Sequence, residues 1–114
     1  MSAVEWASRA HKQIVAVKDD PTKAKQMRTL AMNAPVLVRQ AGAVQAVAFW
    51  RRTAEGKTFS DSVAKVFGTA NGEALLKHLV ESTEVQYVSA SRQLVEATTW
   101  LRRFAQSELE SGKP

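Results

Sequence analysis

The sequence contains no cysteine, so neither a disulfide framework nor a cysteine-based zinc site can support the fold. No apolar run approaches the roughly 20 residues that a membrane-spanning helix requires. The N-terminal stretch MSAVEWASRAHK also lacks the apolar segment of a secretory signal. We therefore expect a cytoplasmic protein that does not enter a membrane and that folds around an ordinary apolar core.

Candidate catalytic and metal-binding side chains are also scarce. The two histidines, His11 and His78, have no carboxylate or second histidine at a spacing suited to metal binding. The segment GTANG, residues 68–72, lacks the lysine and the hydroxyl residue of a phosphate-binding loop. No serine has a recognisable activating partner. We therefore expect no enzymatic activity, no metal and no cofactor.

Positive charge is concentrated in one half of the chain. Residues 1–53 contain nine Lys or Arg and three Asp or Glu, giving +6, whereas residues 54–114 contain seven and eight, giving −1. A basic half beside a balanced half is typical of a surface that binds a polyanion. Mild basicity is also common in proteins that bind none, so a helical protein-protein adaptor without a nucleic-acid role remains an alternative.

Helix-start signals and apolar periodicity organise the N-terminal part. Ser2 and Glu5 have the spacing of a capping box, and the helix that follows is expected to end near Val17. Asp20 and Pro21 are a good N-cap and first residue for a second helix. Two acids before a proline are therefore interpreted as helix caps and not as catalysts.

The segment at 33–35, Asn-Ala-Pro, predicts a further boundary, followed by a third helix from about Pro35 to Thr53. This central helix is expected to be buried on two sides. Its small residue Gly42 predicts close helix packing in preference to a hinge. The two apolar stripes consist of Leu37, Ala41, Val44 and Ala48 on one side and Val36, Ala43, Val47 and Trp50 on the other.

In the C-terminal part, a loop over 53–59 is expected to precede a short helix capped by Ser60 and ended by Gly68. Asn71 predicts the start of a helix over 73–81. The expected buried side of that helix consists of Leu75, Leu76, Leu79 and Val80.

The segment TEVQ, residues 83–86, has the spacing of a second capping box and opens a long last helix that is expected to reach about Glu110. Its apolar stripe consists of Tyr87, Ala90, Leu94, Ala97, Leu101 and Phe104. No strand pattern is present. The prediction is an all-α fold in which residues 1–114 form a single compact bundle of five or six helices with a long C-terminal helix.

Two segments carry a family resemblance: APVLVRQAGAVQAVAFW, residues 34–50, and EATTWLRRFAQSELE, residues 96–110. Together they resemble the small helical subunit of type III-B (Cmr) CRISPR-Cas effector complexes, and the order and spacing of the blocks extend the resemblance along nearly the whole chain. Trp50, with Ala43 and Val44, departs from the first block of the family, where other aliphatic residues are more usual. The residues that match the family pattern, and that we expect to pack, are Gly42, Ala48, Phe49, Trp100, Leu101 and Phe104.

The resemblance implies a non-catalytic subunit of an RNA-guided ribonucleoprotein that acts in antiviral defence. Its implied partners are the other Cmr subunits, especially the repeated backbone subunit, together with copies of itself. CRISPR RNA and target RNA would be contacted in the assembled complex, and cleavage would belong to the backbone subunits. No membrane partner is implied.

Basic residues are the candidates for RNA contact. Arg9 and Lys12 are three residues apart, away from the apolar stripe of the first helix, so both are expected to reach solvent on one surface. Arg51 and Arg52 have a simpler interpretation, because cations at a helix C-terminus complement the helix dipole. The full set of RNA-contacting candidates is Arg9, Lys12, Arg39, Arg51, Arg52, Arg102 and Arg103.

Overall fold

Six α-helices follow one another in the computed structural model, which describes residues 2–109. They are α1 (Ala3–Lys18), α2 (Pro21–Ala41), α3 (Ala43–Trp50), α4 (Ala54–Phe67), α5 (Gly72–Val80) and α6 (Glu84–Glu108). The described residues contain no strand. The all-α prediction with a long last helix is therefore confirmed, and the last helix ends at Glu108, whereas Glu110 lies outside the described residues.

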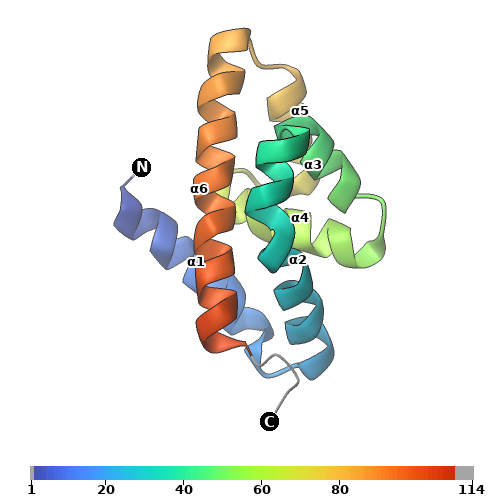
Figure 1. Cartoon of the computed structure of the whole chain (residues 1–114), viewed down its shortest axis with the longest axis vertical. Coiled ribbons are helices and arrows are strands. Elements are labelled where there is room, and N and C mark those ends of the chain that lie inside the picture. The colour runs from blue at the N-terminus through green and yellow to red at the C-terminus, as the bar shows by residue number, and fades with distance from the viewer. Residues whose placement is uncertain (1, 110–114) are drawn as a thin grey trace.

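Helix α6 runs along the long axis of the molecule, with α1 crossing its C-terminal half and α2 beside it (Figure 1). Its buried residues recur at three- and four-residue spacing, as predicted, because that spacing returns to one helix face. They are Ala90, Leu94, Ala97, Thr98, Leu101 and Ala105. Tyr87 and Phe104 pack at the edges of this stripe and are partly buried.

Four of the predicted helix starts, those of α1, α2, α5 and α6, are confirmed by side-chain capping bonds. Ser2 accepts a hydrogen bond from the Glu5 amide (3.2 Å), and Asp20 accepts bonds from the first turn of α2. Asn71 caps α5, and residues 83–86 form a reciprocal capping box at the start of α6. Each cap supplies an acceptor to an amide that has no partner within its own helix.

The boundary predicted at Pro35 is wrong, because α2 continues through this residue to Ala41. Pro35 is fully buried, so burial of its ring in the core accompanies the loss of one helical hydrogen bond. The chain breaks instead at Gly42, whose φ of 91° and ψ of 160° are rarely adopted by L residues. Gly42 is thus the junction between α2 and α3, which corrects its predicted packing role.

The break at Gly42 also divides each of the two stripes of the predicted central helix between α2 and α3. Val36 and Ala48 now belong to different helices, and both are exposed, so the expected burial on two sides is wrong. Ala43, Val47 and Trp50 are buried on the one covered side of α3. Trp50 packs its ring edge-on against Phe59 of α4, with centroids 5.1 Å apart.

The loop predicted over 53–59 is helical as well. The Thr53 hydroxyl accepts a bond from the Gly56 amide (2.9 Å), so α4 begins at Ala54. Ser60 is not a cap but a buried residue inside α4, where its hydroxyl donates to the Lys57 carbonyl (2.8 Å). Gly68 ends α4 in the left-handed conformation, as predicted.

On α5 the buried residues are Leu75 and Leu79, and Leu76 packs against the core at its edge. Val80, expected on the buried side, is 64% exposed because it is the last residue of the helix. Among the described helices, none combines the length and the apolar character needed to span a bilayer.

Candidate functional site

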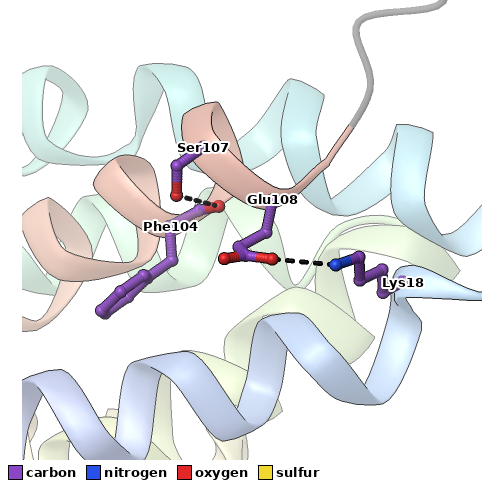
Figure 2. A network of polar contacts seen from close by, with 4 residues as sticks. All are labelled: Lys18, Phe104, Ser107 and Glu108. Atoms are coloured by element: carbon purple, nitrogen blue, oxygen red, sulfur yellow. Dashed lines mark hydrogen bonds and ion pairs between the residues drawn. The ribbon is translucent and has the colours of Figure 1, made fainter.

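Most basic side chains within residues 2–109 have no carboxylate partner. Within residues 2–109 the only ion pair joins Lys18 Nζ to Glu108 Oε2, 2.9 Å apart, where the ends of α1 and α6 meet (Figure 2). None of the candidates for RNA contact therefore has an ion-pair partner in this part of the chain. Such cations remain available to an external anion.

Arg9 and Lys12 differ in their surroundings. Lys12 is exposed, as predicted, but Arg9 is partly buried. Arg9 Nη1 is inaccessible to solvent, has no hydrogen-bond partner within the described residues, and lies 3.2 Å from the position that a Cβ at Gly68 would occupy. The guanidinium therefore rests against the C-terminal end of α4, because α1 packs on α4 along this side. The prediction that both reach solvent on one surface holds only for Lys12.

The neighbouring arginines after α3 also differ. Arg51 is partly buried, and its Nη1 lies 3.2 Å from the position of a Cβ at Gly72, at the start of α5. Arg52 is exposed, and its guanidinium carbon lies 5.5 Å from the centroid of the Phe49 ring. Arg51 is therefore placed against the protein, whereas Arg52 is placed on its surface over an aromatic ring.

A second arginine lies over an aromatic ring on α6. The guanidinium carbon of Arg103 is 4.9 Å from the centroid of Trp100, whose Nε1 donates to Glu96 (3.2 Å). Trp100 stacks on Phe104 at 5.9 Å, and His11 of α1 meets Phe104 edge-on at 5.0 Å. The result is a ring cluster, partly open to solvent, that links α6 to α1.

Both arginine–aromatic pairs are spaced three residues apart on the chain, at 49 and 52 and at 100 and 103. Three-residue spacing places Trp100 and Arg103 on one face of α6, and Arg52, in the turn that follows α3, comes to lie over Phe49. The spacing was present in the sequence and was missed. A guanidinium over a ring is restrained while its N–H edge stays free for an anion. Of the remaining candidates, Arg39 is exposed and Arg102 is partly buried.

The residues expected to pack fall into two groups. Leu101 is fully buried, and Trp100 and Phe104 pack against the core from its edge. Ala48 and Phe49, by contrast, are on the outer side of α3, and Phe49 is 50% exposed. The one-sided cover of α3 accounts for this difference, since its covered side buries Ala43, Val47 and Trp50 and leaves Ala48 and Phe49 exposed.

The described residues contain no group of three or more His, Cys, Asp or Glu side chains arranged to hold a metal ion. His78 lies on α5 with its ring edge-on to Phe67, 5.7 Å between centroids. The surface brings cations and aromatic rings together, as in the Arg52–Phe49 and Arg103–Trp100 pairs. These groups contact phosphates and bases, or the surfaces of other proteins.

The fold and the surface together define a small, basic, all-helical protein. Its surface carries cations without ion-pair partners in residues 2–109 and two arginine–aromatic pairs. The chain belongs to the Cmr5 family, because the family model described as CRISPR-associated protein (Cas_Cmr5) matches residues 2–108. It is 32% identical over 107 residues to the CRISPR system Cmr subunit Cmr5 of Thermus thermophilus, and the match covers 92% of this chain and 93% of that relative.

A solved structure agrees with this assignment. The chain is similar to the X-ray crystal structure of a CRISPR-associated Cmr5 family protein from Thermus thermophilus, with a TM-score of 0.90 and 31% sequence identity. The similarity covers 96% of this chain and 99% of that chain. The resemblance drawn from residues 34–50 and 96–110 is thereby confirmed.

Proposed function

We propose that this chain is a non-catalytic subunit of an RNA-guided type III-B CRISPR-Cas ribonucleoprotein. Copies of it would stack along the repeated backbone subunits and help to seat the target RNA. Family membership supports the place in the complex, since a relative of nearly equal length is named as a Cmr subunit. The observation that carries the RNA role is the set of exposed cations that have no ion-pair partner within residues 2–109.

Exposed cations of this kind suit phosphate contacts. Lys12 on α1 and Arg39 on α2 are both exposed, and they belong to the half of the chain with a charge of +6. Contacts of single cations with phosphates are weak and independent of base sequence. Stacked copies would repeat them along one RNA strand, which raises the overall affinity without any new contact.

The Arg103–Trp100 pair adds a restrained cation to this set. The guanidinium lies 4.9 Å over the ring, so the side chain loses less freedom when it meets a phosphate than a mobile lysine does. Arg9 and Arg51, which are partly buried against Gly68 and Gly72, are weaker candidates than the sequence suggested. The contact set that we propose is therefore Lys12, Arg39 and Arg103.

Catalysis is assigned to other subunits. This part of the proposal is supported by a sequence without an activated nucleophile or a phosphate-binding loop, and by a family resemblance that implies cleavage by the backbone subunits. RNA cleavage by the purified chain that disappears when its own carboxylates are replaced would contradict this assignment.

The RNA role is tested in the complex reconstituted with its other subunits and guide RNA. The triple variant K12E, R39E and R103E should assemble normally but capture less target RNA at low salt. The slope of log affinity against log salt should flatten by about 0.7 for each phosphate of single-stranded RNA that is no longer neutralised. The matched control is K65E, which reverses an exposed cation on α4 that is not in the proposed contact set.

Two results would count against the proposal. If the triple variant captures RNA as the unmodified complex does at every salt concentration, these cations are only a solvated surface. If the unmodified chain folds but does not co-purify with the backbone subunits, the place in the complex is wrong. In that case the chain is an adaptor for some other partner.

A further inference from the structure

Helices α2 and α3 are separated on the surface by two adjoining hollows, of about 280 and 300 Å³. Both hollows are lined by Leu30, Phe49 and Trp50, and Val36 extends the apolar lining along α2. The only charged side chain that lines either hollow is Arg52. We call this feature the α2–α3 groove.

The groove is suited to apolar side chains and one carboxylate. Phe49 is 50% exposed and Val36 is 38% exposed, so the groove leaves large apolar surface in water. Arg52 lies over Phe49 and has no ion-pair partner within residues 2–109. Its guanidinium edge is therefore free to bind a carboxylate in the paired geometry that arginine favours.

A second apolar surface, which carries carboxylates where the groove carries Arg52, lies at the turn between α5 and α6, at one end of the long axis (Figure 1). Val80, Val85 and Val88 are 64%, 81% and 53% exposed. Glu81 and Glu84 lie between them in the chain, are exposed, and have no ion-pair partner in the described part of the molecule. We call residues 80–88 the α5–α6 corner.

These two surfaces account for most of the exposed large apolar side chains. Within residues 2–109 seven such side chains are exposed, namely Val4, Val15, Val36, Phe49, Val80, Val85 and Val88. Five of the seven lie in the α2–α3 groove or on the α5–α6 corner. The α2–α3 groove is concave and carries one cation, Arg52, without an ion-pair partner in residues 2–109. The α5–α6 corner carries two carboxylates without such a partner, exposes Val85 at 81%, and borders a separate hollow of about 940 Å³ that Glu81 and Val85 help to line.

We propose that the α2–α3 groove binds the α5–α6 corner of a second copy of this chain. Val85 and its neighbouring valines enter the hollows beside Phe49, and Arg52 pairs with Glu84 of the second copy. The inference rests on the proposed stacking of copies and names the surfaces that make the contact. Arg52, an RNA candidate in the sequence, is thereby assigned to a protein contact.

A second copy suits the groove better than RNA does. Affinity for RNA grows with the number of phosphates that cations neutralise. The groove offers one cation, Arg52, and its other lining side chains are apolar or neutral polar. The contact joins two different surfaces, so each pair of copies leaves one groove and one corner unused. Contacts of this type extend into open-ended assemblies unless the rotation between copies closes a ring.

The absence of cysteine allows a direct test by disulfide trapping. Asn33 lines the groove, and Val85 is the most exposed valine of the corner. One preparation carries N33C, another carries V85C, and the two are mixed in equal amounts before reconstitution of the complex. Oxidation should link N33C chains to V85C chains. The mixture of K65C with V85C is the matched control and should remain unlinked.

A charge reversal tests the role of Arg52. Adding R52E to the N33C chain should lower the yield of linked dimer severalfold, and adding E84R to the V85C chain should restore at least half of it. Restoration requires that the two charges face each other across the contact. Circular dichroism on each chain verifies that all variants fold.

The outcomes separate the inference from the proposed function. The mixed complex could assemble and capture target RNA without forming a disulfide between N33C and V85C. In that case the α5–α6 corner does not bind in the α2–α3 groove, so the inference is wrong, while the proposed function stands. If R52E weakens RNA capture and E84R does not restore it, the groove binds RNA instead. If the unmodified chain does not enter the complex at all, the proposed function fails and the inference falls with it.

Discussion

Lys18 Nζ lies 2.9 Å from Glu108 Oε2 although the two residues are ninety positions apart in the chain. The pair joins the last residue of α1 to the last residue of α6 (Figure 2). Both side chains remain partly accessible, at 49% and 32%, so water screens the attraction. The pair therefore holds two helix ends together and contributes little to global stability.

The pH dependence of this pair gives a first prediction. The hydrogen bond from Lys18, followed by its charge, holds the pKa of Glu108 below its ordinary value, and the same contact raises the pKa of Lys18. A lowered carboxyl pKa contributes stability that is present at neutral pH and is lost as the pH falls through that lowered value. At the basic end, the contribution is lost as the pH rises through the raised pKa of Lys18.

We expect E108Q to lower the thermal midpoint slightly at neutral pH, and the difference from the unmodified protein to vanish in acid. Thermal unfolding followed by circular dichroism from acidic to neutral pH measures this. The control is E81Q, which removes an exposed carboxylate without an ion-pair partner in residues 2–109 and should show no such pH dependence. A difference for E108Q that persists in strong acid would show that the effect does not come from ionisation.

The Tyr87 hydroxyl is predicted to stabilise the start of α3. The Val44 amide, in the first turn of α3, donates to this hydroxyl at 3.2 Å. Y87F removes the acceptor and leaves the amide without this partner, which should cost about 1 kcal/mol in the free energy of unfolding. Urea unfolding measures the loss. T58V removes an exposed hydroxyl that bonds only within its own helix, and it should change the free energy by less than about 0.5 kcal/mol.

The junction at Gly42 is predicted to require glycine. Its φ of 91° is unfavourable for any residue with a Cβ, so G42A should destabilise the fold by about 1–3 kcal/mol even though a Cβ there would make only an ordinary 3.6 Å contact with Tyr87. The matched control is Q45A, at an exposed position inside α3, which should be nearly neutral. Equal stability of G42A and the unmodified protein would mean that α2 and α3 can join as one helix.

The core stripe of α6 gives a prediction about packing. Leu94 is fully buried where α6 meets the other helices, so L94A should destabilise the protein by about 2–5 kcal/mol through reduced burial and the cavity left behind. Val95 is the adjacent residue and only partly buried, so V95A should cost clearly less. Chemical unfolding of the two variants under the same conditions makes the comparison. Similar losses for both would contradict the assigned orientation of α6.

The local signals that were read correctly depend on short-range interactions. The caps at Ser2, Asp20, Asn71 and Thr83 each use an amide two or three residues further along the chain, so the residues involved are close in the sequence. The error at Pro35 has a different origin. Pro35 disfavours a helix locally, but its buried ring lies in the core and α2 continues through it.

The sequence by itself determined the starts of α1, α2, α5 and α6, the all-α class, the basic N-terminal half and the family, because these follow from residue types and from spacings of a few positions. Only the tertiary structure decided which cations are free. Arg9 and Lys12 are three residues apart, yet one lies against Gly68 and the other reaches solvent. Likewise the exposure of Phe49 and the pairing of Lys18 with Glu108 depend on how distant helices pack, and that arrangement is set by interactions across the whole chain.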